Sequence, residues 1–222
     1  MSRFVVEFGK DGTPPPIEGR LDAPAFHRNH AAIWEAIGPR LSTREGSLLE
    51  IGSGTGQHTV TFASRTPRLI WYPSDILESH LSSIAAWRTE SGLPNVAKPQ
   101  RIDLTDAAWT WHPGGRLAAM LCINVLHISP WTVSENLIGG AARFLASDGR
   151  LFVYGPFMRD GAHTAPSNAA FDASLRAQNP AWGVRDTGDL AALAASHGLT
   201  LAEIVPMPAN NFVLAFARAT RS

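Results

Sequence analysis

Apolar and polar residues alternate along this chain in blocks that predict helices and short strands in turn. Residues 24–41 carry apolar side chains at helical spacing, namely Phe26, Ile33, Ile37 and Leu41, with Trp34 beside them. Short apolar runs at 47–51 and 69–72 predict two strands, and Pro73 is expected to end the second. Each run is followed by a helical segment, at 57–64 and from a cap at Ser74 or Asp75 to about residue 91.

The second half of the chain continues this alternation. We expect strands at 96–104, 117–125 and 150–154, helices at 134–146 and 186–197, and a terminal antiparallel hairpin formed by 199–205 and 212–217. The nearly continuous apolar run 117–125 is typical of a strand buried on both faces of a parallel sheet. The pattern predicts an α/β fold, a Rossmann-like, doubly wound, mainly parallel seven-stranded sheet with a C-terminal antiparallel hairpin.

Two segments do not follow the alternation. Residues 1–22 include three successive prolines, at 14–16, which neither a helix nor a paired strand accommodates. We expect them to form an arm or lid before a single domain at 23–222. Residues 155–183 contain three prolines and many polar residues, and this length predicts a functional insertion rather than a plain connector.

The composition narrows the classes of partner. Lys plus Arg and Asp plus Glu each number 19, so the formal net charge is zero and a broad basic surface for nucleic acid is not expected. Cys122 is the single cysteine, which excludes an internal disulfide and favours a reducing compartment. No apolar stretch approaches the roughly 20 residues that cross a bilayer, and no signal peptide is recognised. We therefore expect a cytoplasmic protein that binds neither nucleic acid nor membranes.

The strongest local signal is the segment 50–56, with the sequence Glu-Ile-Gly-Ser-Gly-Thr-Gly, between a predicted strand and a predicted helix. Glycines at alternate positions let the backbone turn sharply and let a ligand approach where a Cβ would collide. The dinucleotide pattern G-x-G-x-x-G, counted from Gly52, requires glycine or alanine at position 57, where Gln57 stands. A nicotinamide oxidoreductase is thus disfavoured. A phosphate loop and a serine hydrolase are also disfavoured, because the chain lacks the following lysine and the G-x-S-x-G spacing.

The segment resembles motif I of the class I S-adenosylmethionine-dependent methyltransferases. By this resemblance, Glu50 helps to hold the methionine amino end of the cofactor. The loop residues that line the cofactor are then Gly52, Ser53, Gly54 and Gly56.

The same resemblance implies an acid at the end of the second strand that binds the ribose hydroxyls, and Asp75, followed by Ile76, stands there. A polar or acidic residue near the adenine is expected after the third strand, where Asp103 and Leu104 match it. The alternatives are that Asp75 only caps a helix and that Asp103 is only a loop carboxylate.

The end of the fourth predicted strand is where methyltransferases of this class place the methyl acceptor. Asn124 offers an amide to the cofactor or acceptor, and His127 is a candidate general base, with an ordinary pKa near 6.5. The alternative is that His127 only packs between strand and helix. Asn124 is followed by Val125 and Leu126 rather than by the Pro-Pro-Tyr of enzymes that methylate amide or base nitrogens, so that chemistry is disfavoured.

Beyond these motifs, the chain from about residue 24 onward resembles the methyltransferase-like protein 26 group. The matching sequence segments lie at 154–157, 167–172, 182–186 and 207–211, and an Arg-Asn pair stands at 28–29. That group usually has a lysine at the next position, where this chain has His30. Aromatic walls and directional polar groups suit a small organic acceptor. We assign to catalysis His127 and Tyr154, and to the substrate Arg28, Asn29, His30, Phe157, Trp182, Asn210 and Asn211.

The resemblance implies S-adenosyl-L-methionine as the cofactor and S-adenosyl-L-homocysteine as its product. We expect a methyltransferase that acts on a small organic molecule and that forms a homodimer. The alternative is a non-catalytic or regulatory protein that binds S-adenosylmethionine. His27 and His30, three residues apart, form only a weak metal-ligand spacing, so no metal is expected.

Overall fold

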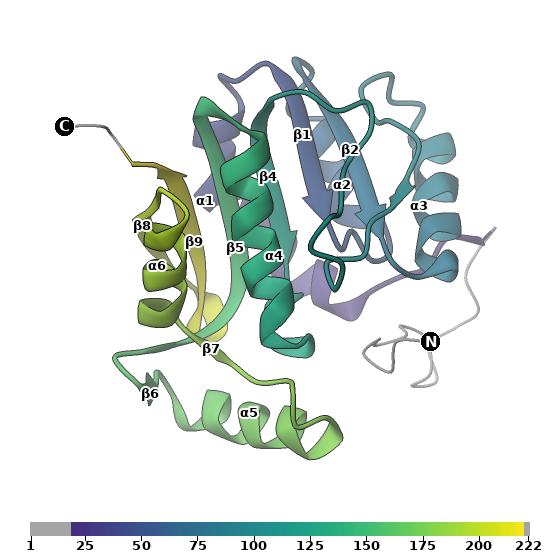
Figure 1. Ribbon diagram of the computed structural model, residues 1–222. Coiled ribbons are helices and arrows are strands. Elements are labelled where there is room, and N and C mark those ends of the chain that lie inside the picture. The colour runs from purple at the N-terminus through teal and green to yellow at the C-terminus, as the bar shows by residue number, and fades with distance from the viewer. Residues whose placement is uncertain (1–18, 220–222) are drawn as a thin grey trace.

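The computed structural model describes residues 19–219, which form one sheet with helices on both faces (Figure 1). Of the predicted arm at 1–22, residues 1–18 lie outside the described part of the chain. The strand order is β3 (Gln100–Arg101), β2 (Leu69–Asp75), β1 (Gly46–Ile51), β4 (Leu117–Ile123), β5 (Leu145–Arg159), β9 (Asn211–Arg218) and β8 (Leu199–Met207). Neighbours from β3 to β5 are parallel, whereas β9 is antiparallel to both β5 and β8. The predicted fold class is therefore confirmed.

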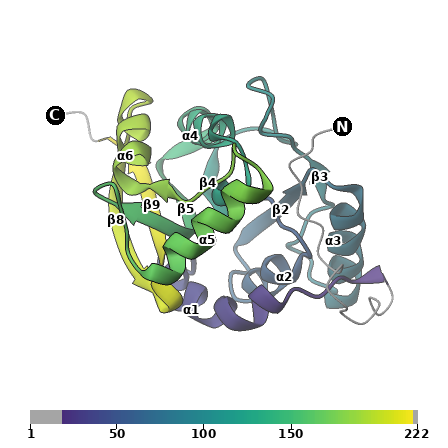
Figure 2. The same ribbon diagram turned by 90° about the horizontal axis from the view of Figure 1, so that it is seen from below.

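The helices form two layers that enclose the sheet (Figure 2). One face is covered by α1 (Pro24–Leu41), α2 (Gln57–Ala63) and α3 (Glu78–Ser91), and the other by α4 (Trp131–Phe144) and α6 (Thr187–Ser196). Successive strand residues point to opposite faces, so Leu48 packs in the core beneath α1 and α2, and Leu49 in the core beneath α4 and α6.

The first helix has the bounds that the apolar spacing predicts. Pro24 occupies its first turn, where a missing N–H costs nothing. Ile33, Ile37 and Leu41 are fully buried against the sheet. Burial of such a side chain contributes about 1.5–3 kcal/mol, so this stripe fixes α1 on the sheet.

Pro73 does not end the second strand, contrary to expectation. β2 continues to Asp75, and Pro73 is paired in register with Glu50 of β1. The N–H and C=O of Trp71 bond to Asn95 and Ala97 on the outer side of β2. Residues two apart direct their backbone groups to the same side, so the nitrogen of Pro73 also faces outward and no bond to β1 is lost.

Two further boundaries differ from the predictions. The third strand shrinks to Gln100–Arg101 plus a single bridge between Val96 and Trp71, because Pro99 supplies no N–H at this edge of the sheet. The helix expected to be capped by Ser74 or Asp75 begins later, at Glu78, with Leu77 as its N-cap residue. The helix expected at 186–197 is α6, and Asp186 is its N-cap residue, because its side chain accepts a hydrogen bond from the N–H of Gly188.

The predicted insertion at 155–183 is ordered structure rather than a long loop. Its first residues prolong β5, and the chain then forms β6 (Ala162–His163) and α5 (Pro166–Gln178) before it returns through β7 (Arg185–Asp186), which pairs with β5. Figures 1 and 2 show α5 lying beyond the carboxyl ends of the strands. The excursion thus covers the edge where doubly wound sheets bind ligands.

No helix within residues 19–219 is both long enough and apolar enough to cross a membrane.

Candidate functional site

A pocket opens at the carboxyl ends of β1, β2 and β4. The chain after β1 enters α2 on one face of the sheet, and the chain after β4 enters α4 on the other, which leaves a crevice between them. The empty volume of the pocket, its open mouth included, is about 1100 Å³. Its walls include nine of the ten residues predicted to bind the cofactor, namely Glu50, Gly52, Ser53, Gly54, Asp75, Ile76, Asp103, Leu104 and Asn124.

The glycines of the loop between β1 and α2 are required for different structural reasons. Gly52 and Gly56 have φ angles of +65° and +92°, in the left-handed region. A Cβ on Gly52 would lie 2.5 Å from Cγ2 of Val125, a residue on the opposite wall of the pocket. A Cβ on Gly56 would lie 2.9 Å from the Cα of Ile84 in α3. Gly56, which does not line the pocket, therefore allows α2 to begin against α3.

Glu50 places a buried carboxyl group in the pocket. The side chain is 1% exposed and accepts a hydrogen bond from the hydroxyl of Thr59. Burial, with a smaller contribution from the nearby carboxylate of Asp75, raises the pKa of Glu50 to about 7. A cationic ligand group in the pocket would reverse this effect and hold Glu50 ionised. The group therefore suits a ligand that carries an ammonium.

Asp75 joins the loop, the end of β2 and the approach to α3. Its Oδ2 accepts a hydrogen bond of 2.9 Å from the N–H of Gly54. Its Oδ1 accepts bonds of 2.8 Å and 3.1 Å from the N–H groups of Ile76 and Leu77, and Nδ1 of His80 lies 3.1 Å away. Each carboxylate oxygen has two lone pairs, so Oδ2 retains capacity for a ligand hydroxyl.

The far end of the pocket combines one carboxylate with apolar walls. Oδ1 of Asp103 accepts hydrogen bonds of 2.9 Å and 2.7 Å from the N–H and hydroxyl of Thr105, which fixes the side chain and leaves Oδ2 unused. The apolar residues that line the pocket include Ile76, Ile102, Leu104, Ile128 and Val133. This arrangement suits a flat ring with a hydrogen-bond donor at its edge.

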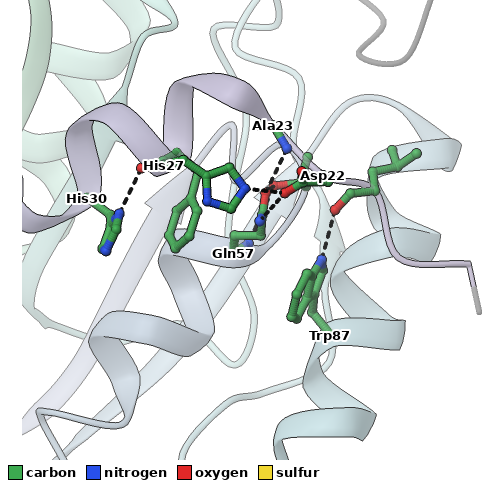
Figure 3. A network of polar contacts seen from close by, with 9 residues as sticks. Asp22, Ala23, His27, His30, Gln57 and Trp87 are labelled. Carbon is green, nitrogen blue, oxygen red and sulfur yellow. Dashed lines mark hydrogen bonds and ion pairs between the residues drawn. The ribbon is translucent and has the colours of Figure 1, made fainter. Parts of the chain in front are cut away.

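Hydrogen bonds hold the segment before α1 against α2 and α3 (Figure 3). The amide of Gln57 donates a bond of 2.6 Å to Asp22 and accepts one of 2.8 Å from the N–H of Ala23. Nε1 of Trp87 donates to the carbonyl of Leu21 at 3.0 Å. Ala23 lines the pocket together with Ala25 and Phe26. Gln57, the residue that departs from the dinucleotide motif, therefore holds the segment before α1 at the pocket.

A second cluster lies beyond β5 and connects to the pocket through one asparagine. Asn29 is buried and bonds to the Tyr154 hydroxyl. Its Oδ1 accepts a hydrogen bond of 2.9 Å from Nε2 of His58, a residue that lines the pocket. Burial raises the pKa of Tyr154, although this bond and nearby Arg28 lower it in part. The structure thus brings the predicted pair Arg28 and Asn29 together with Tyr154, which lies far from them in the sequence.

His127 is enclosed by protein rather than placed on the wall of the pocket. Burial and, to a smaller extent, the charge of Arg185 lower its pKa to about 4. Its ring packs edge-on against Phe171 of α5, at 5.5 Å between centroids. The sequence expectation of a pKa near 6.5 is therefore wrong, and the imidazole is neutral at pH 7.

Asn124 adopts a backbone conformation that is uncommon outside glycine. Its φ is +58°, and its N–H donates to the carbonyl of Tyr154 at 2.9 Å. This turn places the residue at the pocket wall directly after β4.

The remaining substrate assignments are dispersed. Phe157 is 2% exposed in the core beneath α4 and α6, and Trp182 is also buried. Asn210 is exposed in the turn between β8 and β9, where its carbonyl accepts a bond from Asn168 of α5. Neither these residues nor Asn211 and His30 line the pocket, so their contact with a substrate stays a prediction.

Several residues of the site were missed by the sequence reading. His58 and Thr59 lie in the first turn of α2 and contact the site, and His80 lies in the first turn of α3. A usable signal existed, since the first turn of a helix that follows a ligand-binding loop faces the same crevice. Among residues 19–219 no three His, Cys, Asp or Glu side chains gather in a way that could hold a metal ion.

Comparison with known proteins agrees with the fold. A sequence model of the family described as protein of unknown function (DUF938) matches residues 20–218. Among solved structures, the S-adenosylmethionine-dependent methyltransferase SibL in its apo form has a TM-score of 0.70 and 20% identity, over 88% of this chain and 56% of that one. An O-methyltransferase family protein from Burkholderia thailandensis has a TM-score of 0.70 and 18% identity, over 89% of this chain and 60% of that one.

A third similar structure is CalO1, a methyltransferase in calicheamicin biosynthesis, in its S-adenosylhomocysteine-bound form. Its TM-score is 0.65 and its identity 16%, over 87% of this chain and 55% of that one. The chain thus spans slightly more than half the length of these proteins, and the similarity establishes a shared α/β methyltransferase fold.

Proposed function

The chain belongs to the family described as protein of unknown function (DUF938), and from this premise we propose that it is an S-adenosylmethionine-dependent methyltransferase that acts on a small organic molecule. The observation that carries the proposal is the convergence of Glu50, Asp75 and Asp103 around the glycine loop in one pocket. These carboxylates lie at or just after the carboxyl ends of β1, β2 and β3, and point to a ligand with donor groups at three separate places.

The donor set fits S-adenosylmethionine. Glu50 would hold the ammonium of the methionine part, which supplies the positive charge that a buried carboxyl group with a pKa near 7 requires. Asp75 would accept the ribose hydroxyls, and the slot near Asp103 and Leu104 would take the adenine. When bound, the cofactor supplies a methyl group on a sulfonium centre for in-line transfer.

The protein groups contribute positioning rather than a strong base. His127 is neutral with a pKa of about 4, and burial raises the pKa of Tyr154. Transfer from a sulfonium can depend mostly on orientation and exclusion of water, so acceptors that need no strong base fit best. The bonds of Gln57 to Asp22 and Ala23 close one side of the pocket and would help to exclude water.

A small acceptor is the class favoured by the surroundings of Tyr154. Arg28, Asn29 and Tyr154 form a polar group beside the pocket, and α5 covers this edge of the sheet. One of the similar structures, CalO1, is described as a methyltransferase in calicheamicin biosynthesis. We also propose that the chain is a member of the methyltransferase-like protein 26 group, that it is cytoplasmic and that it forms a homodimer.

A non-catalytic protein that binds S-adenosylmethionine is the second candidate. It is favoured by one observation, that neither His127 nor Tyr154 lines the pocket and neither is poised to take a proton near neutral pH.

The proposal is tested by calorimetric titration of the full chain with S-adenosylhomocysteine, with NAD as a parallel control. Micromolar binding of the first ligand alone supports it, and absence of binding to folded protein overturns it. A Glu50→Gln variant should lose most of the affinity, whereas Glu135→Gln, an exposed substitution on α4, should not. Methyl-labelled S-adenosylmethionine is then offered with a metabolite extract. Labelled product supports the enzyme, and tight binding without transfer supports the second candidate.

A further inference from the structure

A groove on the opposite edge of the sheet is lined by arginines. It lies at the amino ends of the strands, where Arg68 precedes β2, Arg116 precedes β4 and Gly46 begins β1. Its empty volume, open solvent included, is about 1450 Å³. The charged residues that line it are Arg40, Arg44, Arg68, Arg116, Arg150, Glu45, Asp148 and Glu203. Five cations and three anions give it a formal charge of +2, in a chain whose formal net charge is zero.

Two of these arginines are neutralised by carboxylates. Arg40 pairs with Glu203, and Arg44 pairs with Asp148 at 3.2 Å. Both also bond backbone carbonyls of α1. These pairs form the rim of the groove and hold its shape, because every nitrogen of the two guanidinium groups already has an acceptor.

Arg68 and Arg116 are held differently. Nη2 of Arg68 donates to the carbonyl of Thr43 at 2.9 Å, and Nη1 of Arg116 donates to the carbonyl of Arg143 at 2.6 Å. Neither forms an ion pair with a carboxylate of residues 19–219, and no hydrogen bond within that range uses Nε or Nη1 of Arg68 or Nε or Nη2 of Arg116. Each guanidinium is therefore oriented by one nitrogen and offers the others to a ligand.

The spacing of the two arginines sets the size of the ligand. They precede β2 and β4, the two neighbours of β1, so their backbones are two strand spacings apart, roughly 10 Å. Arg68 is tied to the carbonyl of Thr43 before β1, and Arg116 to the carbonyl of Arg143 near the end of α4, so the two guanidinium groups are held to different segments. Linked phosphates can extend from one of these groups to the other. Three carboxylates in the same groove repel a long polyanion and leave room for a compact one.

We propose that this groove is a second binding site, for a compact anion that contains linked phosphate groups, either a nucleoside triphosphate or a short inorganic polyphosphate such as tripolyphosphate. Arg68 and Arg116 supply paired N–H donors to two different phosphates. The site is on the opposite edge of the sheet from the methyltransferase pocket and does not depend on the function proposed for that pocket.

Calorimetric titration of the full chain with tripolyphosphate, ATP, AMP and orthophosphate tests the proposal. We expect tripolyphosphate to bind at least tenfold more tightly than AMP or orthophosphate, and to weaken as salt is raised. An ATP affinity equal to that of tripolyphosphate shows that the shared triphosphate group alone is recognised, a weaker ATP affinity assigns inorganic phosphate chains, and a tighter one assigns a nucleotide. No binding of either at low salt, or equal affinity for orthophosphate, overturns the proposal. Binding of an RNA oligonucleotide without tripolyphosphate binding overturns it as well.

The variant Arg68→Gln with Arg116→Gln should lower tripolyphosphate affinity at least tenfold. Arg159→Gln, at the far end of β5, is the matched control and should leave it unchanged. If the double variant does not fold, protection is measured on the unmodified chain, where tripolyphosphate should slow the reaction of phenylglyoxal at Arg68 and Arg116 but not at Arg159. Equal modification rates with and without tripolyphosphate would contradict the site.

Discussion

The backbone N–H of Gly54 donates a hydrogen bond of 2.9 Å to Oδ2 of Asp75, so the glycine loop after β1 and the acid at the end of β2 form one unit. The same carboxylate accepts two further backbone N–H groups through Oδ1. A substitution at Asp75 therefore disturbs the loop as well as any ligand hydroxyl.

Asp75→Asn should weaken the binding of S-adenosylhomocysteine by about 1.5–3 kcal/mol. The two carboxylate oxygens of Asp75 accept three backbone N–H groups and would accept a ligand hydroxyl, whereas an asparagine amide has only one oxygen to accept them. Calorimetric titration measures this loss. Asp160→Asn is the control, since Asp160 is exposed and asparagine tolerates its φ of +53°. Unchanged affinity in folded Asp75→Asn protein would remove Asp75 from the ligand site.

Glu50 should make the free protein less stable at high pH. Its pKa rises from the ordinary 4.5 to about 7 on folding, so the folded state holds the proton more tightly than the unfolded state. Stability falls as pH rises from 4.5 to 7, by about 3 kcal/mol in total. Glu50→Gln should therefore be about 1–3 kcal/mol more stable than the unmodified chain at pH 8 and equal to it near pH 4.5 in urea unfolding.

The same group should make ligand binding dependent on pH. A ligand ammonium requires ionised Glu50, so the affinity for S-adenosylhomocysteine should fall as pH drops below about 7. Calorimetry at pH 6 and pH 8 tests this. An affinity that does not change between these values would show that Glu50 does not face the ammonium.

Gly52→Ala should both destabilise the protein and abolish ligand binding. The added Cβ would lie 2.5 Å from Cγ2 of Val125, and the backbone φ of +65° is unfavourable for alanine. We expect a loss of about 2–4 kcal/mol in urea unfolding. Gly92→Ala is the matched control, because Gly92 has a φ of +61° with nothing within 4 Å, and it should cost only about 1 kcal/mol. Equal losses in the two variants would show that the clash with Val125 is relieved at no cost.

Gln57→Ala should release the segment that covers the pocket. The variant loses the bond to Asp22 and leaves the buried N–H of Ala23 without its acceptor. The dissociation rate of S-adenosylhomocysteine should rise about threefold to tenfold, as followed by surface plasmon resonance. Gln178→Ala on α5 is the control. A dissociation rate equal to that of the unmodified chain would show that this segment does not gate the ligand.

His127 should remain neutral across the physiological range. Its pKa of about 4 reflects burial and the neighbouring Arg185, so its ring signals in NMR should not move between pH 5.5 and 8. A peptide histidine titrates near 6.5 and serves as the reference. A midpoint for His127 near 6.5 would contradict the enclosed placement.

Much of the site was predictable because it follows the strands directly. Parallel strands end at one edge of the sheet, so Glu50, Asp75 and Asp103 meet there regardless of side-chain detail, and alternate glycines mark the loop. The predictions failed where long-range pairing decided a boundary. Pro73 stays in β2 because its nitrogen faces away from β1, and Asp75 serves the loop rather than capping α3.

The sequence by itself determined the succession of strands and helices along the chain and the stripe on α1, since each depends on local spacing. It also indicated the carboxylates of the pocket, through the resemblance to motif I of the class I methyltransferases. Only the tertiary structure decided the charge state of His127, the docking of Gln57 on Asp22, and the link from Tyr154 through Asn29 to His58. Each of these features depends on which residues, distant from one another in the chain, pack together and exclude water. Burial and hydrogen-bond partners arise from packing, and no periodicity in the sequence encodes them.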